Sequence, residues 1–208
     1  MFTGIVEEVG TIERQSLLLE GVEAYIAAPI CTPQLKVGDS IAINGVCSTV
    51  SRMDERGFHV QWMAETLKKT SLNLLSEKEK VNLELSVTPT TRLGGHLVTG
   101  HVDETGTIRL LKLENGFGSI EIAYSSQFYP YLIPKGSITL DGISLTLVEV
   151  TPSWFRCELI PHTLAHTTLQ FKKDGDCIRI EYDLIGKYLF HFYQSSPAIH
   201  STTDHQIK

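Results

Sequence analysis

The sequence predicts an all-β protein built from two homologous halves and followed by one α-helix. Three observations support this fold class. A block at the N-terminus returns in the second half of the chain, short β-branched runs separated by turn-forming residues occur in both halves, and a helical stripe of apolar residues follows them. The chain has 208 residues, 42% of them hydrophobic and 20% charged, which is typical of one large or two small globular domains.

The internal repeat is the strongest of these observations, because it keeps its order and spacing. Seven of the ten residues in 3–12 are identical to those in 99–108, at an offset of 96. The blocks that match are 3–12 with 99–108, 40–50 with 137–147, 66–72 with 163–169, and Glu84 with Glu181. Chance similarity between β-type segments would not keep one register along the chain. We therefore expect two copies of one domain, residues 1–96 and 97–183.

Each copy is expected to be mostly strand. The β-branched runs, which Gly, Pro, Asn and Asp separate, are 40–50, 58–63, 81–87, 137–150, 155–160 and 177–182. Closely spaced short strands of this kind favour a small barrel or a sandwich. One short helix per copy is expected, over 65–75 and over 162–171. The segment 88–95, which contains Pro89, Gly94 and Gly95, is expected to join the copies.

A helix is predicted over 184–194, with Asp183 as its N-cap. Its apolar residues recur at helical spacing and are Leu184, Ile185, Tyr188, Leu189, Phe192 and Tyr193. Such a stripe packs either against the protein's own barrels or against copies of itself. We expect the second arrangement, which makes this segment an oligomerisation helix. Residues 195–208 are polar and are expected to be disordered.

Charge and composition exclude several partners. The formal charge of −6 gives no basic surface for nucleic acid, and no apolar run is long enough to span a membrane. The N-terminus carries acidic residues where an export signal has basic ones, so we expect a cytoplasmic protein. Cys31, Cys47, Cys157 and Cys177 have no metal-ligand or dithiol spacing. We therefore expect reduced thiols, no metal and no cofactor.

Several motifs together resemble the riboflavin synthase family. They are segments 1–7, 44–50, 94–103, 141–146, 160–164 and 183–188, which read MFTGIVE, NGVCSTV, GGHLVTGHVD, DGISLT, IPHTL and DLIGKY. The resemblance runs from residue 1 to about residue 193. It implies two six-stranded Greek-key barrels with a C-terminal helix, and a homotrimer held partly by these helices.

The resemblance also implies the reaction. Two molecules of 6,7-dimethyl-8-ribityllumazine bind at each active site, and one donates a four-carbon unit to the other without a cofactor. The products are riboflavin and 5-amino-6-(D-ribitylamino)uracil, which makes this the final step of riboflavin biosynthesis. Lumazine synthase stays open as a partner.

The resemblance assigns candidate residues to two pockets. His101, Ser144 and Thr146 would line the catalytic pocket of the C-terminal copy, and Cys47 and Thr49 the partner pocket of the N-terminal copy. Phe2 would lie over the site, while Lys135 and Asp183 would reach in from near the subunit boundary. The catalytic candidates are His101, Ser144, Thr146, Cys47, Phe2 and Asp183. The substrate-binding candidates are Gly4, Ile5, Val6, Cys47, Ser48, Thr49, Gln61, Trp62, Met63, Ala64, Glu65, Thr66, Gly100, His101, Val102, Lys135, Ser144, Leu145, Thr146, Leu159, Ile160, Pro161, His162, Thr163 and Leu164.

The repeat supports this assignment independently. Positions that match between the copies should bind the ligand common to both pockets, because glycines allow close approach and hydroxyls can bind a ring edge. These pairs are Thr3/Thr99, Gly4/Gly100, Gly45/Gly142, Thr49/Thr146, Thr66/Thr163 and Thr70/Thr167. Positions that differ should separate donor from acceptor, and they are Ile5/His101, Asn44/Asp141, Cys47/Ser144, Glu65/His162 and Ser86/Asp183. The second set holds most of the groups that can move a proton.

Two other classes of protein remain as alternatives. A non-catalytic lumazine- or flavin-binding protein of the same fold would lack the second-copy Gly-His-Val-Asp pattern, which this sequence has at residues 100–103. A flavin-binding barrel of a larger oxidoreductase would come with a nicotinamide-binding fingerprint, which this sequence lacks. We read His166 as a surface residue, although it lies four residues after His162.

Overall fold

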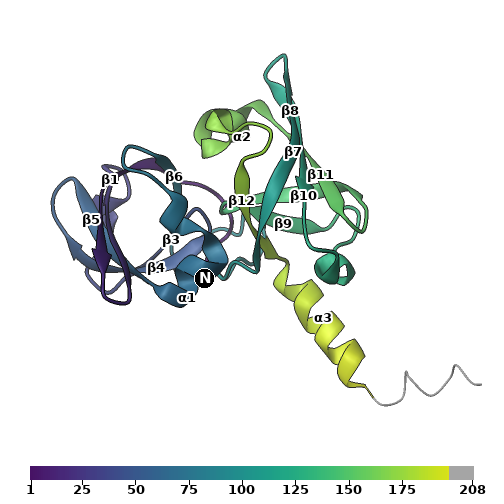
Figure 1. Cartoon of the computed structure of the whole chain (residues 1–208), viewed down its shortest axis with the longest axis horizontal. Coiled ribbons are helices and arrows are strands. Elements are labelled where there is room, and N and C mark those ends of the chain that lie inside the picture. The colour runs from purple at the N-terminus through teal and green to yellow at the C-terminus, as the bar shows by residue number, and fades with distance from the viewer. Residues whose placement is uncertain (197–208) are drawn as a thin grey trace, which may run out of the picture.

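Two closed six-stranded antiparallel barrels lie beside each other in the structure, a computed structural model that describes residues 1–196 (Figure 1). The first barrel consists of β1 (Glu8–Leu18), β2 (Gly21–Ala27), β3 (Ser40–Ile43), β4 (Val46–Met53), β5 (Gly57–Met63) and β6 (Lys80–Leu85). The second consists of β7 (Glu104–Glu114), β8 (Phe117–Ala123), β9 (Ser137–Leu140), β10 (Ile143–Val150), β11 (Trp154–Leu159) and β12 (Cys177–Tyr182).

Both barrels have the same strand order. The first closes as β1-β2-β5-β4-β3-β6 and the second as β7-β8-β11-β10-β9-β12. The all-β fold with two tandem six-stranded barrels is therefore confirmed, and the repeat in the sequence is a repeat of whole barrels.

Two of the runs expected as single strands are hairpins. The runs 40–50 and 137–150 each turn at two residues with positive φ, Asn44 (46°) with Gly45 (77°) in the first and Asp141 (44°) with Gly142 (82°) in the second. Asn-Gly and Asp-Gly are the residue pairs that favour a two-residue hairpin turn. The turns thus produce β3–β4 and β9–β10.

Alternation along the strands builds a separate core in each barrel. On β4, Val46, Ser48 and Val50 point inward and are buried, while Cys47 is half-buried and Thr49 is exposed on the outer face. The repeat pattern of β10 is the same. The outer face of one hairpin in each barrel is therefore free to form a binding surface.

The expected short helices are each broken in two. The first is α1 (Ala64–Thr70) followed by the 3₁₀ turn η2 (Leu72–Leu74), and the second is α2 (Pro161–His166) followed by η4 (Thr168–Phe171). Ser71, with φ 53°, ends α1 in the left-handed region. The remaining 3₁₀ turns are η1 (Thr32–Gln34) and η3 (Ser126–Tyr131).

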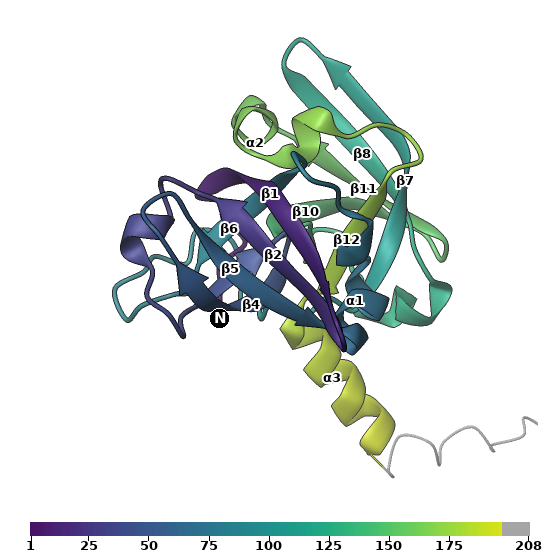
Figure 2. The same ribbon diagram turned by 60° about the vertical axis from the view of Figure 1, so that its left-hand side comes forward.

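The C-terminal helix is α3 (Leu184–Ser195), one residue longer than expected. Asp183 caps it as predicted, because its Oδ1 accepts a 3.0 Å hydrogen bond from the Ile185 amide. The ring of Phe190 packs edge-on against Tyr131, with centroids 5.2 Å apart. From there α3 projects away from both barrels (Figure 2). The prediction for the polar tail falls almost entirely on residues 197–208, which lie outside the described residues.

None of the helices in the described part of the chain is long and apolar enough to cross a membrane.

Candidate functional site

Two segments cross from one barrel to the other. Residues 3–6 lead into β1 of the first barrel but lie on the second, where the Gly4 carbonyl accepts a 2.7 Å hydrogen bond from the Ser144 amide. Residues 99–102 lead into β7 of the second barrel but lie on the first, where the Gly100 carbonyl accepts a 2.8 Å bond from the Cys47 amide. Each barrel is thus covered by the entry segment of the other.

The glycines at these crossings are required by space and by backbone conformation. Gly4 has φ +78° and Gly100 has φ +79°, a region that L side chains rarely adopt. A Cβ on Gly4 would lie 2.6 Å from the Ser144 Cβ, and one on Gly100 would lie 2.7 Å from the Cys47 Cβ. The matched pair Gly4/Gly100 therefore brings the backbone close to the partner barrel.

A buried carboxylate holds each crossing segment. Glu84 on β6 accepts hydrogen bonds from the Thr3 amide, the Thr3 hydroxyl and the Gly4 amide at 2.6, 2.8 and 3.0 Å. Glu181 on β12 accepts the same three bonds from Thr99 and Gly100 at 2.7, 2.7 and 2.9 Å. Burial raises the pKa of Glu84, and the Thr3 and Gly4 donors oppose this shift.

A cavity lies beneath each crossing segment. The cavity on the first barrel measures about 260 Å³ and is lined by Val46, Cys47, Glu65, Thr66, Lys69, Thr70, Gly100, His101 and Val102. The cavity on the second measures about 200 Å³ and is lined by Gly4, Ile5, Val6, Ile143, Ser144, Ile160, His162, Thr163, His166 and Thr167. Three of the matched pairs line these two cavities, Gly4/Gly100, Thr66/Thr163 and Thr70/Thr167, and so do three of the differing pairs, Ile5/His101, Cys47/Ser144 and Glu65/His162.

The prediction that His101 shares a pocket with Ser144 and Thr146 is wrong. His101 does not lie with Ser144 and Thr146 in the second barrel, but beside Cys47 in the cavity of the first. Ile5 takes the corresponding place beside Ser144. The reason is that the two entry segments cross. Ile5 precedes the first barrel in the chain but lies on the second, and His101 precedes the second barrel but lies on the first.

Several candidates have buried side chains that cannot touch a ligand in this chain. Phe2 is predicted to lie over the site, but its side chain is 1% exposed and packs against Val98 and against Ala42 of the first barrel. The Ser48 hydroxyl accepts a 2.9 Å bond from the Trp62 indole inside the first barrel. Buried candidates that point into a barrel core are Ser48, Trp62, Leu145 and Leu159. Only the backbone of these residues can contribute to a surface site.

Other candidates lie on the outer surface beside the cavities. Thr49 and Thr146 are exposed two residues beyond Cys47 and Ser144, and Gln61 and Met63 are exposed on the outer face of β5. Ala64 begins α1 next to them. These residues can meet a ligand larger than the cavity itself.

Lys135 and Asp183 are not among the described residues that line the two cavities. Lys135 is exposed in a left-handed turn with φ 69°, and its amide binds the Leu147 carbonyl. Asp183 caps α3. Their expected approach from a neighbouring subunit stays a prediction.

Lys69 and His166 line the two cavities, although neither is among the predicted ligand-binding residues. Lys69 lies one helical turn from Glu65 on α1, with Nζ 3.4 Å from its Oε1. His166 lies one turn from His162 on α2, with ring centroids 4.1 Å apart. His166 is a surface residue as expected, but it also lines the second cavity. The spacing of four residues on a short helix was the available signal.

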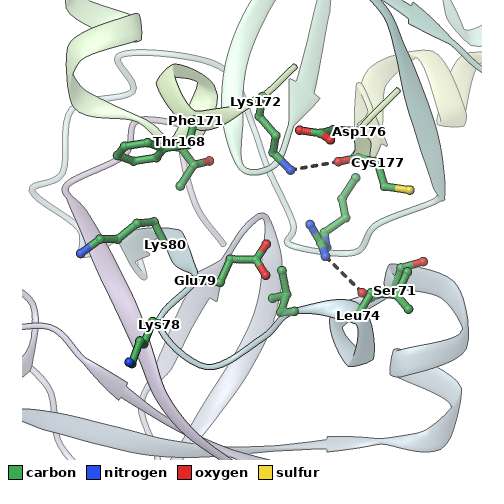
Figure 3. A pocket seen from close by; sticks show the side chains of 12 residues that line it. Ser71, Leu74, Lys78, Glu79, Lys80, Thr168, Phe171, Lys172, Asp176 and Cys177 are labelled. Carbon is green, nitrogen blue, oxygen red and sulfur yellow. Dashed lines mark hydrogen bonds between the residues drawn. The ribbon is translucent and has the colours of Figure 1, made fainter. Parts of the chain in front are cut away.

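A larger hollow of about 450 Å³ lies between the barrels but is not the candidate site (Figure 3). The Arg179 guanidinium at its wall donates to the Ser71 carbonyl at 3.3 Å. Lys172 donates to the Cys177 carbonyl at 2.9 Å and pairs with Asp141. Arg179 therefore joins the two barrels across the hollow, whereas Lys172 bonds within the second barrel. Among residues 1–196, no group of three His, Cys, Asp or Glu side chains is placed to hold a metal ion.

Comparison with known proteins shows the family of the chain. The profile of the lumazine binding domain matches the chain twice, at residues 3–86 and 99–183. The protein is thus of the class with two lumazine-binding domains in tandem. The chain is 42% identical over 198 residues to the riboflavin synthase of Actinobacillus pleuropneumoniae, covering 95% of this chain and 92% of that one. It is 40% identical over 192 residues to that of Bacillus subtilis (strain 168), with coverages of 92% and 89%. The chain belongs to the riboflavin synthase family.

Solved structures share the fold. Crystal structures of LumP with 6,7-dimethyl-8-(1'-D-ribityl) lumazine and with riboflavin match with TM-scores of 0.80 and 0.82, at 20% and 21% sequence identity. Each match covers 88% of this chain and 99% of the other. At this identity the likeness shows the fold alone.

Proposed function

We propose that the chain catalyses the dismutation of two 6,7-dimethyl-8-ribityllumazine molecules into riboflavin and 5-amino-6-(D-ribitylamino)uracil. The single observation that carries this proposal is the presence of two cavities of one design, each beneath a segment of the opposite copy. A dismutation needs two identical molecules, and two homologous pockets can hold them. Moving a four-carbon unit between these molecules makes the enzyme a transferase.

In this reaction the protein has to bind the two lumazines and to transfer protons. The C7 methyl group of a lumazine is acidic because its carbanion is delocalised into the ring, so a modest base can remove the proton. A nucleophile that adds to C7 of the other lumazine prepares it for condensation. Holding both rings in register can contribute up to about 7–11 kcal/mol to the rate.

The residues that differ between the cavities are proposed to divide these tasks. The first cavity offers the exposed His101 imidazole beside Cys47, Glu65 and Lys69. The second offers the Ser144 hydroxyl, with Ile5 in the place of His101. The matched pairs Thr66/Thr163 and Thr70/Thr167 line both cavities and are proposed to bind what the two substrates have in common.

We further propose a homotrimer in which the first barrel of one subunit faces the second barrel of the next. The apolar residues that α3 exposes support an association between copies. All four cysteines of the chain are unpaired, which supports a cytoplasmic location. Association with lumazine synthase stays a prediction from the family.

The test is to incubate the purified protein with 6,7-dimethyl-8-ribityllumazine alone and to follow riboflavin fluorescence. One riboflavin should form for every two lumazines consumed, and a chelator should not change the rate. Lumazine that binds tightly but is recovered unchanged would instead identify a non-catalytic binding protein of the same fold. Activity lost to a chelator and restored by a metal would contradict the cofactor-free reaction.

A further inference from the structure

His96 joins two hydroxyl groups on the outer face of the second barrel. Its Nδ1 lies 2.7 Å from the Ser144 Oγ, and its Nε2 lies 3.1 Å from the Thr139 Oγ1. Ser144 on β10 and Thr139 on β9 are directly opposite each other in the strand register. Both ring nitrogens of His96 are thus engaged by one cross-strand pair.

The loop before His96 is built to place the imidazole there. The His96 amide donates a 3.0 Å bond to the Thr3 carbonyl. A Cβ on Gly95 would lie 2.2 Å from the Thr3 carbonyl oxygen and 2.7 Å from the Ser144 Cβ, so only glycine allows this approach. Ser144 lines the second cavity, and His96 lies outside the lining that the described residues form.

The corresponding place in the first barrel is apolar. Its cross-strand pair is Cys47 opposite Ala42, the repeat positions of Ser144 and Thr139. Phe2 and Val98 pack against this pair in one buried cluster. The two cavities therefore differ in what supports their central residue, a hydrogen-bonded imidazole in one and a hydrocarbon cluster in the other.

The surroundings of His96 favour the neutral form of its imidazole. Burial lowers the pKa of His96, and the charge of Asp183 opposes the shift without cancelling it. A neutral imidazole carries one N–H, so one ring nitrogen donates and the other accepts. Because the Thr139 hydroxyl can either donate or accept, both tautomers keep both hydrogen bonds.

We propose that His96 is a positioning residue that fixes the Ser144 hydroxyl and sets whether it donates to or accepts from the substrate in the second cavity. With the proton on Nδ1, His96 donates to Ser144 Oγ, and the hydroxyl proton is free to point at the ligand. With the proton on Nε2, Ser144 donates to Nδ1, and its remaining lone pair faces the ligand. The inference rests on the proposed function, since it names a task in that reaction.

Three variants of His96 separate positioning from space filling. An Asn side chain places its amide near the position of Nδ1, and a Gln side chain places its amide near that of Nε2. His96→Asn should keep the contact with Ser144 and at least a third of the turnover number. His96→Gln and His96→Ala should each lose about tenfold or more, although Gln is closer to His in volume. A role in packing alone would give the opposite order, with Gln better than Asn.

A second test measures the effect of His96→Ala in the presence and in the absence of Ser144→Ala. If His96 acts through Ser144, His96→Ala should cost about tenfold in the natural background and less than twofold in the Ser144→Ala background. Equal losses in both backgrounds would overturn the inference, as would unchanged turnover in His96→Ala. Thermal unfolding of each variant shows whether it folds, and the Asn–Gln order still decides the matter if the Ala variant does not.

Failure of the inference is distinguishable from failure of the function. Natural protein that forms no riboflavin would overturn the proposed reaction. Whether or not the natural protein forms riboflavin, the ¹⁵N chemical shifts of the His96 ring report its tautomer in the ligand-free protein. These shifts should change in Ser144→Ala and stay unchanged in Cys47→Ala, the matched change in the other barrel. If the His96 shifts are the same in Ser144→Ala as in the natural protein, the hydrogen bond between His96 and Ser144 is contradicted.

Discussion

Glu84 and Glu181 make the same three hydrogen bonds in the two halves of the chain, but the segments they hold deliver different side chains. The segment held by Glu84 presents Ile5 to the second cavity, and the one held by Glu181 presents His101 to the first. The two carboxylates are thus a natural matched pair for testing the crossing segments.

Glu181→Gln should reduce turnover more than Glu84→Gln does. Each variant weakens hydrogen bonds to a charged acceptor, worth about 1.5–3 kcal/mol each, so both should lower the free energy of unfolding by comparable amounts. Only Glu181→Gln loosens a segment that carries a proton-moving group. Urea unfolding and steady-state rates on both variants provide the measurement. A greater loss of turnover in Glu84→Gln would contradict the assignment of His101.

A second prediction concerns a buried ion pair in the second barrel. The corresponding residues of the first barrel form a neutral pair. Asp141 Oδ1 accepts from the Arg179 amide at 2.9 Å and lies 3.0 Å from Arg179 Nη1. In the first barrel, Asn44 Oδ1 accepts from the Asn82 amide at 2.8 Å. Asp141→Asn should keep the backbone bond but leave Arg179 buried without its counter-charge, at a cost of about 3–5 kcal/mol. The double variant Asp141→Asn/Arg179→Asn, which copies the neutral pair, should regain at least half of this loss in urea unfolding.

The same pair predicts a pH dependence. Burial raises the pKa of Asp141, but the charges of Arg179 and Lys172 together with two hydrogen bonds from Arg179 outweigh burial, so the pKa lies below its ordinary value. The stabilisation is therefore present above the ordinary carboxyl pKa and is lost as the pH falls toward the lowered one. Between about pH 7 and about pH 3, natural protein should lose more unfolding free energy than the double variant. Equal losses would show that Asp141 contributes nothing to acid unfolding.

The repeat predicted the two barrels, but it did not predict that the entry segment of each barrel lies on the other barrel. A repeat aligns residues by order along the chain, so it identified Ile5 and His101 as equivalent without showing that each lies on the opposite barrel. Strand alternation alone predicts an inward Trp62 and Ser48, whereas the family resemblance placed them at the ligand. His96 lies outside the blocks that match between the copies, so comparison of the copies could not find its role.

His101→Ala should reduce turnover far more than it weakens lumazine binding. The side chain is exposed in the first cavity, and its counterpart Ile5 shows that a cavity of this design can be closed without an imidazole. Loss of a general acid or base costs about 10²-fold or more in rate. Lumazine titration beside steady-state kinetics separates the two effects, and Ile5→Ala is the matched control. Binding lost as severely as turnover would make His101 a binding residue.

The last prediction concerns assembly through α3. The helix exposes Ile185, Tyr188, Leu189 and Phe192, each more than half exposed. Leaving such side chains in water forgoes roughly 1.5–3 kcal/mol each, which favours burial against copies of the same helix. We expect light scattering to show a trimer at micromolar concentration.

Leu189→Glu combined with Phe192→Glu should dissociate this trimer, because it places charges in the apolar contact. Gln194→Glu adds a charge at an exposed polar position of the same helix and should leave the trimer intact. If the first barrel of one subunit meets the second barrel of the next, the dissociated variant should lose turnover while both barrels still bind lumazine. A monomeric variant with full turnover would show that the two cavities of one chain suffice, and the intersubunit site would be wrong.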